Sequence, residues 1–176
     1  QYDYIVLDLF NGDTTPYHLL SREALAQIRA RLAPGGVVAV NLVSSADGKS
    51  AAPVLAMLER VFGAVRVYPL RAPGSPLANL VAIAGTAPLG EARLPERWLD
   101  DVHPLARAGV QRALAEARAF TAPPGMPLIT DEHNPVDVQD AAVRDALRRQ
   151  ILAGTASSIL LGEPRRGAGG SERAKP

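Results

Sequence analysis

The chain has 176 residues and a formal net charge of +1, with 47% hydrophobic and 21% charged residues. That length suffices for one domain with a hydrophobic core, and the balanced charge provides no strong field for attracting nucleic acid or a membrane surface. Because there is no cysteine, a disulfide scaffold and a thiolate metal site are excluded. No apolar run reaches the roughly 18 residues of a membrane span and no signal-peptide pattern opens the chain, so we expect a cytoplasmic protein.

The rest of the sequence is organised around its first stretch. Residues Tyr4 to Leu7 form a short apolar run, rich in β-branched and aromatic side chains, that ends abruptly at Asp8. Such a run predicts a β-strand buried on both faces. Asp8 and the loop formers after it, among them Asn11 and Asp13, are then expected at the carboxyl edge of a sheet, where open α/β proteins bind ligands. The alternative is that Asp8 only caps a loop or the next helix.

Helical and extended patterns alternate over the next part of the chain. Apolar spacing over residues 21–32 predicts a helix with Ser21 as its N-cap, ended by the Pro-Gly-Gly turn at residues 34–36. Residues 37–42 predict a second buried strand, and residues 51–62 predict a second helix.

Two further strands are predicted at residues 65–70 and 80–84. The turn-rich connector between them, residues 71–76, is short enough for an antiparallel pair, whereas strands joined through helices should be parallel. The fold class is therefore predicted to be α/β, with a doubly wound, mostly parallel sheet whose last strand is antiparallel.

The last third of the chain is predicted to add helices. An amphipathic pattern over residues 103–120 predicts a long helix with Leu105 on its apolar side, and residues 141–152 predict a final helix. Gly, Arg, Pro, Ser and Lys dominate the end of the chain, which predicts disorder. We therefore expect one domain over residues 1–153 and a disordered tail over residues 154–176.

Four segments resemble a known family. Tyr2 to Asp8, Pro16 to Glu23 and Leu32 to Gly36 are similar to the second half of the spermidine synthase family. These polyamine aminopropyltransferases share the fold of class I S-adenosylmethionine-dependent methyltransferases. Thr130 to Pro135 resembles the threonine-acid-acid-x-Asn-Pro motif near the end of some spermidine synthase-like proteins. The resemblance extends over residues 2–137.

The resemblance implies a seven-stranded sheet in which the predicted strands take the fourth to seventh places. No Gly-x-Gly follows a strand early in the chain, so the glycine-rich nucleoside loop and the ribose-binding acid are expected elsewhere. The chain is therefore interpreted as the C-terminal half of a catalytic domain. Its first strand is expected to pair with a missing N-terminal half or with a second copy in a homo-oligomer.

The activity implied by the resemblance is transfer of an aminopropyl group to a polyamine. No tightly bound cofactor is expected; decarboxylated S-adenosylmethionine, or S-adenosylmethionine itself, would be the co-substrate. A free alkylammonium has a pKa near 10 and must lose its proton before attack, which a nearby carboxylate can accept. In the family the strand-end Asp is the proposed base, which corresponds to Asp8.

Four residues are candidates for binding the amine substrate. The family's second acid, three positions beyond the base, is replaced here by Asn11, and Asp13 could compensate. Tyr17 could line the amine pocket, although a packed loop tyrosine is the simpler interpretation. Asp131 could close a loop over the site or only cap the last helix. The family's loop tyrosine before the last strand is absent from residues 72–75.

Other interpretations stay open at this stage. His18 and His133, with Asp131, lack the spacing of metal ligands on one element, so no metal site is predicted. The same fold could belong to a methyltransferase that uses intact S-adenosylmethionine. A third alternative is a non-catalytic remnant or interaction module.

Overall fold

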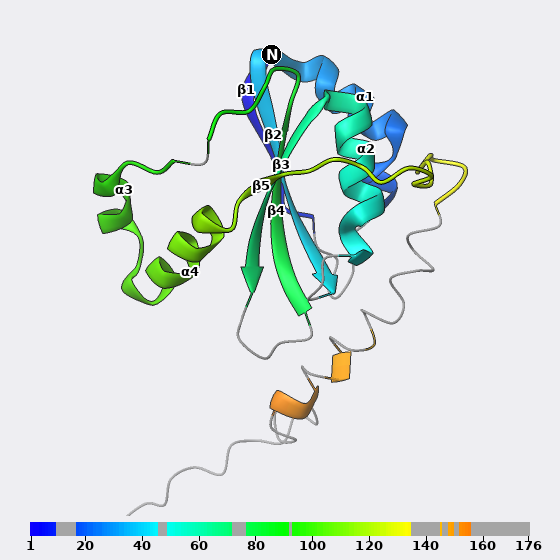
Figure 1. Ribbon diagram of the computed structural model, residues 1–176. Coiled ribbons are helices and arrows are strands. Elements are labelled where there is room, and N and C mark those ends of the chain that lie inside the picture. Colours follow the sequence, from blue (N-terminus) through cyan, green and yellow to red (C-terminus); the bar gives the residue numbers. More distant parts are fainter. Residues whose placement is uncertain are drawn as a thin grey trace, which may run out of the picture.

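The computed structural model describes residues 1–9, 17–45, 49–71, 77–91, 93–134, 145, 148–149 and 152–155. They form a five-stranded sheet in the order β1-β2-β4-β3-β5, with helices beside it (Figure 1). In chain order the elements are β1 (Tyr2–Leu7), η1 (Tyr17–Leu20), α1 (Arg22–Arg31), β2 (Leu32–Ser45), η2 (Lys49–Ala51), α2 (Ala52–Phe62), β3 (Ala64–Arg71), β4 (Leu77–Gly85), α3 (Glu96–Asp101), α4 (Pro104–Ala115) and β5 (Arg118–Ala119).

The strand directions confirm the predicted α/β fold with a reversed last strand. β1 pairs with β2 in parallel, joined through α1, whereas β4 is antiparallel to both of its neighbours, β2 and β3. Because β2 and β3 both oppose β4, they run in the same direction. Figure 1 shows α1 and α2 on one side of the sheet and α4, which contacts β3, on the other.

The hydrophobic core lies between the sheet and helices α1 and α2. Side chains alternate along β2, so that every second residue from Val38 points into this core. α2 is apolar on most of its surface, and its Met57 and Leu58 side chains are fully buried. The residues contributed by β2 and β4 to this core are Leu32, Val38, Val40, Leu42, Leu80, Ala82 and Ala84.

Two local features attach β1 and α1 to the rest of the sheet. Ser21 is fully buried, and its hydroxyl oxygen accepts a hydrogen bond from the N–H of Ala24 at 3.1 Å, which confirms it as the N-cap. At Gly36 an added Cβ would lie 2.9 Å from the carbonyl oxygen of Tyr2 and 3.1 Å from that of Asp3. Glycine at this position therefore permits the close approach of β1 to the start of β2.

The prediction that the first strand is buried on both faces is wrong. Within the described residues β1 pairs only with β2 and forms an edge of the sheet, and no helix covers its second face. As a result the side chains of Tyr4 and Val6 are 77% and 71% exposed, while Ile5 and Leu7 on the opposite face pack against the core.

The predicted helix over residues 103–120 is too long. α4 ends at Ala115, and the chain then forms the short strand β5, which pairs with the free edge of β3. The N–H of Phe120 donates to the carbonyl oxygen of Val65 at 2.9 Å, so edge pairing replaces helical hydrogen bonds. Leu105, expected on the apolar side, is 90% exposed in the first turn of α4. The sequence pattern did not predict the short helix α3.

Several predictions fall on residues outside the described part of the chain. These include the loop with Asn11 and Asp13, residues 72–75, most of the predicted final helix and residues 156–176. In the part that is described, no helix is both long and apolar enough to cross a membrane.

Candidate active site at the carboxyl edge of the sheet

Asp8 follows the last residue of β1 and lies against Asn41 of β2. The parallel register pairs Leu7 with Val40, so the next residues, Asp8 and Asn41, come side by side on the same face of the sheet. The side-chain amide nitrogen of Asn41 donates a hydrogen bond to Oδ1 of Asp8 at 3.0 Å. Asp8 is exposed, so a ligand at this edge can reach its carboxylate.

Asn41 has a second, unusual property. Its amide oxygen Oδ1 is buried and accepts no hydrogen bond from any residue that the structure describes. Buried polar atoms without a partner are rare in proteins, because they lose their hydrogen bonds to water. The sequence pattern predicts Asn41 only as a strand residue. The signal that points to a further role is a single amide within the otherwise apolar run Val37 to Val43.

Asp131 is held in place by the amino-terminal turn of α1. The N–H of Asp131 donates to the Glu23 carboxylate at 3.2 Å, and the N–H of Arg22 donates to the carbonyl oxygen of Ile129 at 2.9 Å. Thr130 and His133 exchange backbone hydrogen bonds, which closes the turn that carries Asp131. A segment distant in sequence is thereby fixed beside α1.

Glu23 is the charged group that joins these two segments. A hydrogen bond from its own backbone N–H, followed by the Arg22 guanidinium at 2.7 Å and the N–H of Asp131, holds the pKa of its carboxyl below the ordinary value of 4.5. The favourable position of an acid in the first turn of a helix adds to this arrangement.

A cavity of about 480 Å³ lies beside the end of β1 and contains Asp131 in its wall. Its floor is mainly apolar, and His18 is its second titratable residue. Asp8 does not line this cavity, since side chains alternate along the chain and Leu7 and Leu9 face it instead. The complete lining is Leu7, Leu9, His18, Leu19, Ala24, Gln27, Ile28 and Asp131. The structure therefore does not place Asp8 and Asp131 in one cavity.

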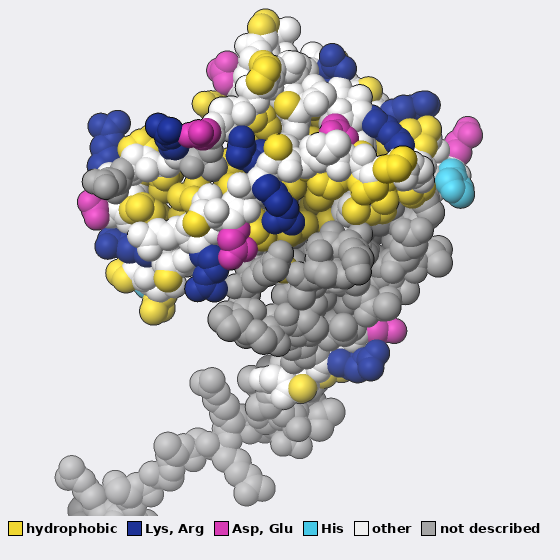
Figure 2. All heavy atoms as spheres, viewed as in Figure 1, with side chains coloured by type: hydrophobic (Ala, Val, Ile, Leu, Met, Phe, Trp, Pro, Cys, Tyr) yellow, Lys and Arg dark blue, Asp and Glu magenta, His cyan; other side chains and the backbone are white. Residues whose placement is uncertain are grey.

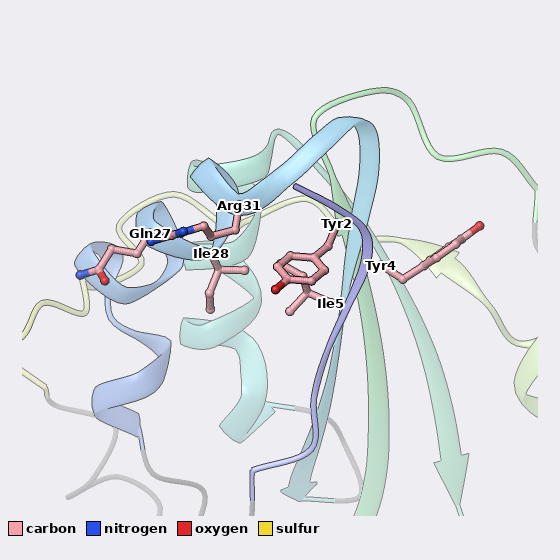
Figure 3. Close-up of a pocket in the computed structure, with 6 residues that line it drawn as sticks. All are labelled: Tyr2, Tyr4, Ile5, Gln27, Ile28 and Arg31. Carbon is pink, nitrogen blue, oxygen red and sulfur yellow. The ribbon is translucent and has the colours of Figure 1, made fainter.

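A second cavity, of about 390 Å³, lies between β1 and α1. Figure 3 shows the side chains of Tyr2 and Ile5 directed toward Ile28 of α1, with Arg31 above them and Tyr4 directed to the other side of β1. Tyr2 is 62% exposed, so this groove is an open apolar surface along the unpaired edge of the sheet.

The remaining candidate residues cannot be brought into one site. Asn11 and Asp13 lie outside the described residues, and for Tyr17 the structure describes only the backbone, at the start of η1. Among the described residues no cluster of His, Cys, Asp and Glu is arranged to hold a metal ion. On the face seen in Figure 2, basic and acidic side chains are interspersed, in keeping with the net charge of +1.

The chain is similar to curated proteins over short segments and to a solved structure in its fold. No family model matches the chain. A polyamine aminopropyltransferase of Vibrio vulnificus (strain CMCP6) is 42% identical over 45 residues, which cover 26% of this chain and 15% of that protein. An N-terminal histidine N-methyltransferase of Emericella nidulans is 32% identical over 68 residues, which cover 39% of this chain and 12% of that protein.

Among solved structures, a probable spermidine synthase from Corynebacterium glutamicum ATCC 13032 superimposes with a TM-score of 0.51 at 21% identity, covering 73% of this chain and 47% of that one. The chain thus spans less than half the length of this structure, and the matched segments are small parts of the two curated relatives. The predicted resemblance to spermidine synthases is confirmed, and the fold of the described residues is similar to that of the probable spermidine synthase.

Proposed function

We propose that this chain is the C-terminal, acceptor-binding part of a spermidine synthase-like transferase. In this proposal it catalyses aminopropyl transfer from decarboxylated S-adenosylmethionine to a polyamine. The observation that carries the proposal is the exposed Asp8 carboxylate at the end of a parallel strand, held at one oxygen by Asn41. The local identity of 42% to a polyamine aminopropyltransferase supports the choice of reaction.

The chemistry requires one proton acceptor and no redox step. The amine nitrogen attacks the methylene carbon next to the sulfonium, a C–N bond forms, and the C–S bond breaks to leave a neutral thioether. The proton leaves the amine nitrogen and goes to the carboxylate of Asp8. Within the described residues only Oδ1 of Asp8 takes part in a hydrogen bond, so Oδ2 is available for that proton.

A diamine also carries a second ammonium group, which an additional carboxylate would stabilise. Asp131 lines the cavity beside the end of β1, and its backbone is fixed to Glu23 of α1. We assign Asp131, together with Asn11, Asp13 and Tyr17, to amine binding as part of this proposal.

The nucleoside donor would bind in a part of the catalytic unit that this chain does not contain. β1 leaves one backbone edge unpaired within the described residues, and Tyr4 and Val6 present exposed apolar surface there. Unpaired strand edges are templates for further strands. In our proposal the strands of a nucleoside-binding half pair with this edge; pairing with a second copy of the chain is the alternative.

A second candidate function is methyl transfer from intact S-adenosylmethionine. It is favoured by the 32% identity over 68 residues to an N-terminal histidine N-methyltransferase. The two candidates differ in the donor and in the group that is transferred, so the mass of the product separates them.

The decisive experiment uses the full-length protein with a diamine and each donor in turn, with products identified by mass spectrometry. Aminopropylated diamine formed from the decarboxylated donor supports the proposal, whereas a methylated product formed only from S-adenosylmethionine supports the second candidate. Asp8→Asn should lower the aminopropyl transfer rate by about 10²- to 10⁴-fold, the usual contribution of a general base. Asp3→Asn, the same change earlier on β1, is the matched control. An unchanged rate in Asp8→Asn would exclude Asp8 as the base.

A further inference from the structure

We infer that Asn41 is a positioning residue, which orients the Asp8 carboxylate for proton transfer at a cost to the stability of the fold. The inference rests on the proposed function, because Asn41 acts on the reaction only through Asp8. Two independent observations support it: a specific contact with the candidate base, and an uncompensated polar atom.

The contact fixes one oxygen of a carboxylate that otherwise has few constraints. Asp8 follows the last residue of β1, where strand pairing has ended. Asn41, by contrast, lies within β2 and is paired with Val81 of β4, so its backbone is anchored in the sheet. The hydrogen bond from its amide to Oδ1 of Asp8, at 3.0 Å, therefore transmits the rigidity of the sheet to the carboxylate.

The same hydrogen bond is compatible with both protonation states of Asp8. When Oδ2 takes the proton from the amine, Oδ1 becomes the carbonyl oxygen of the neutral acid and still accepts from the Asn41 amide. Asn41 exchanges no proton itself. The carboxyl group can thus keep one orientation throughout the transfer, and no step requires it to turn.

The uncompensated atom indicates that Asn41 does not serve the fold. Its Oδ1 is buried without a hydrogen-bond donor among the described residues, which is unfavourable compared with an apolar side chain of the same shape. All other residues from Val37 to Val43 are Val, Ala or Leu. A residue that conflicts with its local surroundings while contacting a candidate catalytic group is the pattern expected where stability is exchanged for function.

The test compares activity and stability in isosteric variants of the full-length protein. Asn41→Leu keeps the shape, removes the donor and removes the unsatisfied acceptor. Its melting temperature should be equal to or above that of the wild type, while kcat for aminopropyl transfer falls about 10- to 100-fold with little change in KM. Asn79→Leu is the matched control, because it makes the same change on a neighbouring strand, away from Asp8. It should leave kcat unchanged.

Asn41→Asp provides a second readout if Asn41→Leu does not fold. It keeps the side-chain shape but places an acceptor where the donor was, so kcat should fall at least as far as in Asn41→Leu. The loss should also vanish in the Asp8→Asn background, since a residue acting through Asp8 has no further effect there.

Three results would overturn the inference. One is a kcat within about twofold of the wild type in both Asn41 variants. Another is a lowered melting temperature in Asn41→Leu with a loss of activity no greater than the loss of folded protein. The third is a full additional loss in the Asp8→Asn background. If Asp8→Asn itself retains activity, the proposed function fails and this inference fails with it; if only the Asn41 variants retain activity, the proposed function stands.

Discussion

The two faces of the sheet carry similar apolar residues, but only one face is covered by helices α1 and α2. Along β2, Val38, Val40 and Leu42 are buried beneath α1 and α2, whereas the alternating residues on the other face, such as Val37 and Val43, are only half-buried. On β1 the contrast is larger, because Val6 is 71% exposed. Strands that are apolar on both faces are usually covered on both faces. We therefore expect the partner half of the proposed function to cover the open face over β1 and β2.

The two faces should differ most in how much the free energy of unfolding falls when an apolar side chain is truncated to Ala. Leu58→Ala removes a fully buried side chain of α2 and should lower the free energy of unfolding by about 2–5 kcal/mol. Val6→Ala on the open face should change it by less than about 0.5 kcal/mol in the chain of residues 1–176. Urea unfolding followed by circular dichroism measures both values. Equal losses of unfolding free energy in the two variants would contradict the conclusion that one face is covered and the other open.

A smaller loss of stability is expected from a substitution at Gly36, where β1 approaches β2 closely. Gly36→Ala places a methyl group about 3 Å from the carbonyl oxygens of Tyr2 and Asp3, so β1 must move away from β2. We expect a loss of about 1–3 kcal/mol, accompanied by faster hydrogen exchange of the β1 amides than of those in β4. Gly109→Ala in α4, where an added Cβ meets no atom within 4 Å, is the control and should be neutral or stabilising.

The smallest effect concerns the turn that carries Asp131. The pKa of Glu23 is below its ordinary value of 4.5 in the folded state, so its interactions stabilise the fold above the unfolded-state pKa and are lost as the pH falls through the lowered value. Glu23→Gln should therefore be less stable than the wild type at neutral pH, and the difference should shrink at acidic pH. Urea unfolding at several pH values tests this, and a difference independent of pH would contradict it. Because the Glu23 side chain is 33% exposed and its ion pair with Arg22 lies at the surface, where water screens it, we expect the change to be modest.

Much of the sheet could be predicted because its strands are continuous apolar runs separated by turn residues. The runs at Tyr4 to Leu7 and residues 37–42, 65–70 and 80–84 all lie within observed strands. The end of α4 and the strand β5 could not be predicted in this way. Arg118 and Ala119 pair with β3 through backbone hydrogen bonds, which depend on a free sheet edge and not on side-chain pattern.

The candidate site was accessible to sequence reasoning only in part. Asp8 is recognisable because it ends an apolar run, but its contact with Asn41 depends on the register of β1 against β2, which the local pattern does not contain. Asp8 does not line the cavity that contains Asp131, because side chains alternate along the chain at the end of β1 and because Asp131 is brought there by a segment distant in sequence. Residue types alone do not predict either the register or this tertiary placement.

The docking of Ile129 beside α1 also has a consequence for biosynthesis. Leu20, Leu25 and Ile129 are all fully buried in one cluster, and the carbonyl oxygen of Ile129 accepts from the N–H of Arg22. The related contact between Asp131 and Glu23 spans 108 residues of sequence. During synthesis, Ile129 leaves the ribosome long after α1. We therefore expect Leu20 and Leu25 to lack part of their packing until then, which leaves apolar surface on the nascent chain that chaperones can bind.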